Sequence, residues 1–236
     1  EQAVEVAKLS LYLKLLEDEG AEANSRQELF KHSDLKLLPS LMGNIKCGNA
    51  LVENDYYLGK EASLFEDLEA MREINTFDWQ DAKGFGAIFA NGGFDCVIGN
   101  PPYVSAPTQI ESPKLKLQRE YLASCGKYKS LYQKWDLYIP FIEKGLSILK
   151  DGGVYSSIIP YPFTNQTYGK VLREVILKDY NLLEMVDLKG TKVFQNATVT
   201  NCIPIIRKDV LGGGVTISHI DEEMNIKVSF EKPITE

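Results

Sequence analysis

The sequence has 236 residues and a net charge of −7, with 44% hydrophobic and 25% charged residues. This composition is typical of a globular protein, and the length is enough for one large α/β domain with or without an appendage. No apolar run is long enough to span a bilayer, and the first residues lack the basic and apolar pattern of a signal peptide. We therefore expect no membrane segment and a cytoplasmic location.

The cysteine and histidine content argues against disulfides and metal sites. The four cysteines are scattered without a C-x-x-C pair: Cys47, Cys96, Cys125 and Cys202. This pattern is typical of reduced, intracellular thiols. With only two histidines in the chain, His32 and His219, we expect no metal.

Hydrophobic periodicity predicts helices and strands in alternation along most of the chain. Residues 2–20 are expected to form a helix that ends at Gly20. Further helices are predicted over 61–75, 79–90, 135–151 and 165–179. Strands are predicted over 44–51, 94–99, 154–160, 182–188, 198–208, 215–220 and 226–230.

This alternation predicts an α/β fold with a doubly wound, mostly parallel sheet and helices on both faces. Strands 182–188 and 198–208 are expected to pair antiparallel, because no long helix separates them. The continuous apolar run at 94–99 is typical of a buried parallel strand. Such sheets bind ligands beyond the carboxyl ends of their strands, where Asn100 follows.

Strand 94–99 stops abruptly on Asn100-Pro101-Pro102-Tyr103. The two prolines rigidify the loop, which then presents the Asn100 side-chain oxygen and the Pro101 carbonyl beside the Tyr103 ring. Two fixed acceptors next to an aromatic face suit a planar group that bears an NH2. Hydrogen bonds from both N–H groups would draw the nitrogen lone pair out of conjugation and orient it toward an electrophile. The alternative is a structural Pro-Pro turn with an asparagine cap.

Residues 112–138, which follow this motif, mix basic side chains with tyrosines. Such a mixture suits a groove that follows a nucleic-acid backbone and stacks bases. The candidate contacts to a DNA backbone are Lys114, Lys116, Arg119, Lys127 and Lys129. The alternative is a solvated helix face whose tyrosines turn toward the core. The net charge argues weakly against a nucleic-acid partner, although the distribution of charge matters more than its sum.

Residues 92–104, GGFDCVIGNPPYV, resemble the catalytic motif of amino-methyltransferases that use S-adenosylmethionine (SAM). More narrowly, they resemble the DNA adenine-N6 methylases of type II (IIG-like) restriction–modification systems. The similarity continues in the family's motif order at 1–17, 44–51, 134–160 and 191–206. It implies a Rossmann-like methyltransferase sheet and methyl transfer from SAM to an adenine flipped out of double-stranded DNA.

The resemblance also implies roles for individual residues. Asn100 and Pro101 would accept hydrogen bonds from the adenine N6 amine within the Asn100–Tyr103 motif, which includes Pro102. Tyr103 and, by a looser match, Phe194 would stack on the base. The residues implied in cofactor binding are Asn49, Ala50, Asn100 and Tyr138. Asn49 stands where many relatives have aspartate.

Two family features have no counterpart in this sequence: the glycine-rich SAM loop and the acidic residue that ends the second strand. We expect both to lie upstream of Glu1, so that the first two strands of the sheet are missing. Residues 1–210 would then form a partial catalytic domain with an insertion at 52–92, and residues 211–236 would begin a following segment. The resemblance also leads us to expect no target-recognition domain in this sequence, because that domain normally follows the methylase domain in the family.

This expected gap in the sheet has physical consequences. The edge of strand 94–99 would be exposed and would seek another strand. We expect the chain by itself to bind SAM weakly or not at all, and to be inactive. We also expect it either to pair with another copy through this edge or to rearrange its sheet.

Other functions remain open at this stage. The same motif occurs in methyltransferases that act on a glutamine side-chain amide of release factors or on guanine N2 in ribosomal RNA, although the insertion favours the restriction–modification group. Cytosine-N4 methylases use related motifs, more often with serine in place of Asn100. A third interpretation is a non-catalytic piece that binds DNA or supports a larger assembly.

Overall fold

The computed structural model describes residues 2–20, 41, 43–58, 73–191, 199–209, 214–221 and 225–233. The chain forms two compact units, 1–48 and 49–236. In the first unit, helix α1 (Gln2–Gly20) confirms the predicted helix. The predicted helix at 61–75 lies almost wholly outside the described residues, and Phe194 lies outside them. None of the described helices is long and apolar enough to cross a membrane.

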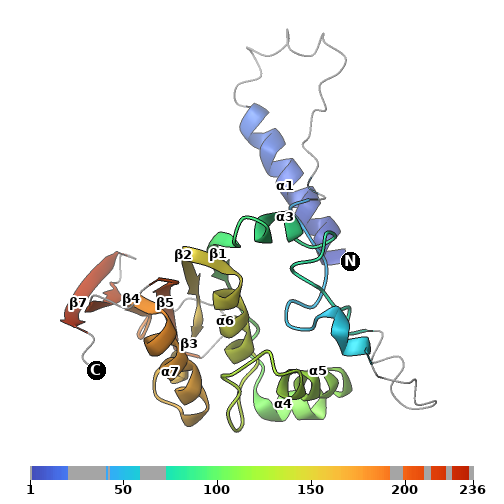
Figure 1. Ribbon diagram of the computed structural model, residues 1–236. Coiled ribbons are helices and arrows are strands. Elements are labelled where there is room, and N and C mark those ends of the chain that lie inside the picture. The colour runs from blue at the N-terminus through green and yellow to red at the C-terminus, as the bar shows by residue number, and fades with distance from the viewer. Residues whose placement is uncertain are drawn as a thin grey trace. The chain divides into compact units, whose positions relative to one another are not determined.

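The second unit is built on a mixed sheet with the strand order β1-β2-β5-β4-β6-β7, in which β3 also pairs with β5 (Figure 1). The strands are β1 (Phe94–Gly99), β2 (Leu149–Ser157), β3 (Ile159–Pro160), β4 (Asn181–Asp187), β5 (Asn201–Arg207), β6 (Gly214–Ile220) and β7 (Ile226–Pro233). Strand β1 pairs parallel with β2, and β5 runs antiparallel to both β2 and β4. The antiparallel prediction for β4 and β5 is thus confirmed. Strands β6 and β7 continue the same sheet from β4.

Short helices precede and connect these strands. They are η3 (Asn54–Tyr57), α3 (Gly86–Phe89), α4 (Ala106–Glu111), α5 (Pro113–Ser124), α6 (Tyr138–Ser147), η4 (Tyr161–Thr164), η5 (Thr167–Gly169) and α7 (Lys170–Asp179). Helices α6 and α7 confirm two of the predicted helices, with shorter bounds. The helix predicted at 79–90 is reduced to the single turn of α3.

Helices α6 and α7 pack on the same face of the sheet. Tyr155 of β2 and Ile206 of β5 are direct cross-strand partners and therefore point to one face. Tyr155 packs against Gly145 of α6, and Ile206 lies with Ile176 of α7 at one cavity. The reason is topological: both crossovers, β1 to β2 and β2 to β4, advance in the same direction, and right-handed crossovers then place both helices on one side.

Two strand predictions need correction. Residues 44–51 form no strand; Asn49 makes a single bridge to Thr76, and its side chain accepts a hydrogen bond from the Leu51 N–H, which bends the chain. Strand β1 is not buried: β2 is its one partner among the described strands, and Ile98 is 84% exposed. An apolar run alone does not distinguish a central strand from an exposed edge.

Candidate active site at the end of strand β1

The loop after β1 is held at both ends by one residue, Ile158, at the junction of β2 and β3. The Ile158 N–H donates a hydrogen bond of 3.2 Å to the Gly99 carbonyl, the last residue of β1. The Tyr103 hydroxyl donates a hydrogen bond of 2.9 Å to the Ile158 carbonyl. The segment Asn100–Pro102 therefore spans two fixed points on the neighbouring strand, and its prolines remove most of the remaining freedom.

The side chains of this loop differ in how far they are exposed. Asn100 is exposed, whereas Pro101 is buried and Tyr103 is half-buried. Burial raises the pKa of Tyr103 to about 12, so its hydroxyl stays protonated and keeps its bond to Ile158 at neutral pH. The loop thus presents an exposed carboxamide beside an uncharged, oriented ring.

Two further tyrosines stand behind Tyr103. The Tyr103 and Tyr138 rings meet edge to face with centroids 6.4 Å apart, and Tyr138 meets Tyr168 in the same way at 6.4 Å. The Tyr138 and Tyr168 hydroxyls are 3.0 Å apart. Tyr138 has no exposed surface, so here it supports the ring of Tyr103 and does not line an open pocket.

The chain beyond the motif is tied to the segment that leads into α6. The Leu137 N–H donates to the Val104 carbonyl at 2.9 Å, and the Ala106 N–H donates to Asp136 Oδ1 at 3.2 Å. Burial raises the pKa of Asp136, which also bonds the Tyr168 hydroxyl. Residues from three distant segments therefore fix the loop, and the sequence gives no local sign of Ile158 or Tyr168 as partners.

Of the four residues predicted to bind the cofactor, Asn100 is exposed, whereas Asn49, Ala50 and Tyr138 make contacts within the protein. The Asn49 carboxamide accepts from the Leu51 N–H at 3.1 Å and donates to Gln118 Oε1 at 3.0 Å. The Ala50 carbonyl accepts from the Trp79 indole at 2.9 Å. Tyr138, the third of these, has no exposed surface.

Two of the five basic residues predicted to contact DNA hold the fold together instead. The Arg119 guanidinium lies 3.8 Å from the centre of the Trp135 ring and donates to the Trp135 carbonyl at 2.9 Å. Lys127 pairs with Glu53 at 2.6 Å and with Asp55 at 2.7 Å. Both cations are therefore committed to internal partners.

The other three basic residues remain candidates for contacts with DNA. Lys114 lies 4.0 Å from Glu73 in a weak, exposed pair. Lys116 and Lys129 are exposed and form no ion pair with the residues that the structure describes.

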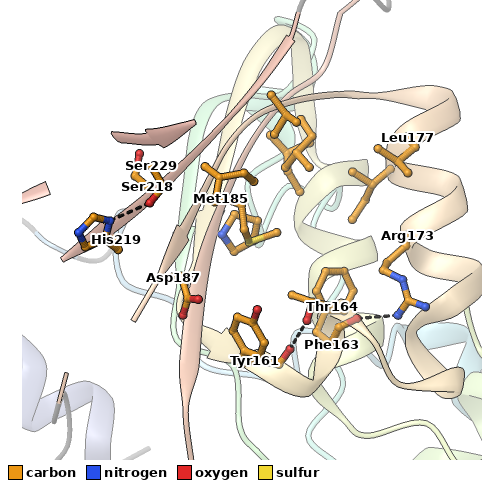
Figure 2. A pocket seen from close by; sticks show the side chains of 16 residues that line it. Tyr161, Phe163, Thr164, Arg173, Leu177, Met185, Asp187, Ser218, His219 and Ser229 are labelled. Carbon is orange, nitrogen blue, oxygen red and sulfur yellow. Dashed lines mark hydrogen bonds between the residues drawn. The ribbon is translucent and has the colours of Figure 1, made fainter. Parts of the chain in front are cut away.

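A separate cavity of about 550 Å³ lies between α7 and strands β4, β6 and β7, and the sequence analysis did not predict it. Figure 2 shows Met185 and Leu177 among its apolar lining, with Asp187 and Tyr161 toward one end. Arg173 donates to the Phe163 carbonyl at its rim. None of the predicted site residues that the structure describes lines this cavity.

Comparison with known sequences shows which family the chain resembles. The family described as Eco57I restriction-modification methylase matches residues 1–194. The chain belongs to this family. It is 30% identical over 209 residues to the type II restriction enzyme and methyltransferase RM.Eco57I of Escherichia coli, which covers 88% of this chain and 18% of that protein.

A second relative is the type II methyltransferase M.PaeR7I of Pseudomonas aeruginosa, 36% identical over 143 residues, or 60% of this chain and 23% of that protein. The chain thus spans about a fifth of the length of these two relatives. The solved structure of the type IIG restriction endonuclease BpuSI matches 61% of this chain and 20% of its own, with 14% identity and a TM-score of 0.45.

Proposed function

We propose that this chain provides the base-binding part of an enzyme that transfers a methyl group from SAM to the N6 amine of adenine in DNA, within a restriction–modification system. The observation that carries the proposal is the Asn100–Tyr103 loop, anchored at both ends to Ile158 in a chain of the Eco57I methylase family. The E. coli relative is named as both restriction enzyme and methyltransferase.

The chemistry follows from the groups that the loop presents. Asn100 Oδ1 and the Pro101 carbonyl each accept a hydrogen bond from one N–H group of the adenine amine, while the base stacks on the Tyr103 ring. Both acceptors increase the electron density on the nitrogen and orient its lone pair away from the ring plane. Because the loop is held before the base arrives, little reorganisation accompanies this polarisation.

The internal contacts of Asn49 and Ala50 and the burial of Tyr138 support a second proposal, which concerns the cofactor. SAM supplies an electrophilic methyl group when it is bound. We propose that the 236-residue chain alone binds SAM weakly or not at all. Isothermal titration of the chain with SAM tests this point, and a dissociation constant in the micromolar range would contradict it.

The reaction is tested with the full-length natural protein, labelled SAM and unmethylated plasmid DNA. Digestion to nucleosides should yield labelled N6-methyladenine. Asn100→Ala should lower the rate by about 10²–10³, the usual loss for one preorganised hydrogen-bonding group at a reacting atom. Asn91→Ala is the matched control, because Asn91 is exposed and precedes β1 at its opposite end.

Each outcome of this experiment is informative. Label in N6-methyladenine that is lost with Asn100→Ala but kept with Asn91→Ala supports the proposal. Label in another base, or in protein or RNA, would reject adenine as the substrate, although the same loop chemistry would also fit a glutamine amide. Equal rates for Asn100→Ala and the wild type would reject the role of Asn100.

A further inference from the structure

The loop between α5 and α6 ends in an exposed tip, which we define as Tyr132, Gln133 and Lys134. Resting on the proposed function, we propose that this tip contacts the DNA strand beside the flipped adenine. Tyr132 would stack on a neighbouring base, and Lys134 would bind a backbone phosphate. The tip would thus make the DNA contacts that the sequence had assigned to Arg119 and Lys127, which are engaged in internal contacts.

The backbone of the tip adopts a rare conformation. Gln133 has a φ of 54°, a region that residues other than glycine seldom occupy. Arg119 stabilises this conformation, because its guanidinium donates to the Gln133 carbonyl at 3.3 Å and to the Trp135 carbonyl at 2.9 Å. Backbone outliers of this kind are concentrated at functional sites.

The base of this loop is joined directly to the Asn100–Tyr103 motif. The Gln109 amide nitrogen donates to the Val104 carbonyl at 3.1 Å and to the Trp135 carbonyl at 3.2 Å. Gln109 is buried, and its amide oxygen accepts from Arg119 at 3.0 Å. One buried amide therefore links the residue after Tyr103 to the residue after the tip, so both segments are held together.

The side chains of the tip fit a nucleic-acid strand. Tyr132 is 39% exposed, and its hydroxyl accepts a hydrogen bond of 3.0 Å from the Gln133 amide, which orients the ring. Lys134 is exposed and has no ion pair among the described residues. An oriented aromatic ring beside an unpaired cation is the combination that binds single-stranded bases and their phosphates.

The test measures DNA affinity of the full-length natural protein as a function of salt. The probe is an unmethylated duplex of random sequence. Lys134→Ala should reduce the slope of log K against log salt by about 0.9, the value for one phosphate contact. Tyr132→Ala should weaken binding by about 5- to 150-fold, as for the loss of one stacked base. Tyr132→Phe keeps the ring and loses only the hydrogen bond from Gln133, so it should weaken binding much less than Tyr132→Ala.

Two controls separate binding from folding. Gln133→Gly removes the side chain but favours the positive φ, so the midpoint of thermal unfolding should not fall. Lys178→Ala removes an exposed lysine at the far end of α7 and should leave the salt slope unchanged.

The outcomes also distinguish this inference from the proposed function. Tyr132→Ala and Lys134→Ala variants that methylate and bind like the wild type would overturn the role of the tip and leave the methylase function intact. A protein that binds DNA through the tip without methylating it would overturn the proposed function alone. A wild-type protein that does not bind DNA would overturn both.

Discussion

Replacing Tyr103 with phenylalanine tests whether one hydroxyl fixes the ring at the candidate active site. The substitution removes the 2.9 Å hydrogen bond to the Ile158 carbonyl and keeps the edge contact with Tyr138. A neutral hydrogen bond of this kind contributes about 1 kcal/mol net. In a protein of this size, that loss should lower the midpoint of thermal unfolding by about 2–4 °C.

The same loss should slow methyl transfer by about fivefold, because 1.4 kcal/mol corresponds to a factor of ten. Tyr103→Ala, which also removes the stacking surface, should slow it far more, by about 5- to 150-fold beyond Tyr103→Phe. The measurements are differential scanning calorimetry on the 236-residue chain and single-turnover methylation by the full-length natural protein.

A matched control is Tyr155→Phe, which removes the 2.8 Å hydrogen bond from a buried hydroxyl to Ser157. It should lower the unfolding midpoint by a similar amount without changing the methylation rate. The reasoning is refuted if Tyr103→Phe methylates at the wild-type rate, since the ring would then need no anchor at Ile158.

Three further substitutions address the sheet edge, an ion-pair cluster and the core. Ile98 is 84% exposed on the open edge of β1, so the chain should self-associate as its concentration rises. Ile98→Lys should reduce this self-association, as measured by sedimentation velocity. Equal self-association of the wild type and the variant would contradict a role for the edge. Burial opposes the ionisation of Glu53, but hydrogen bonds and charges from its two lysine partners outweigh it and lower its pKa. Glu53→Gln should therefore lower the midpoint of thermal unfolding at pH 7. The difference in midpoint between wild type and variant should vanish as the pH falls below 4.5, the ordinary pKa of a glutamate, and passes through the lower pKa of Glu53 in the folded protein. A difference that persists at pH 2 would contradict this. Gly145→Ala places a Cβ 2.3 Å from the Tyr155 ring. The cost of overpacking, about 1–3 kcal/mol, should exceed the gain of about 1 kcal/mol in helix propensity, so the midpoint of thermal unfolding should fall. An unchanged midpoint in calorimetry would contradict the close contact.

Local patterns in the sequence determined much of this fold. Helices α1, α6 and α7 and strands β2, β4 and β5 lie where apolar periodicity predicts them, because a repeat of 3.6 or 2 residues reports which face of an element is buried. The Asn100–Tyr103 loop was also evident from the sequence, since the restriction that proline places on the backbone is covalent and independent of context.

The tertiary structure alone decided which groups this loop contacts. Ile158 holds it through backbone atoms, which leave no trace in residue identity. From the sequence alone, Arg119 and Lys127 could not be distinguished from the other basic residues near the motif. Only the folded structure shows that Arg119 contacts Trp135 and that Lys127 pairs with Glu53. The apolar run at 94–99 did not itself predict the exposed edge of β1, because an apolar strand has the same sequence whether one or two neighbours pair with it; that expectation came from the family's strand order. Pairing between distant segments is a property of the assembled sheet, and no local window of the chain contains it.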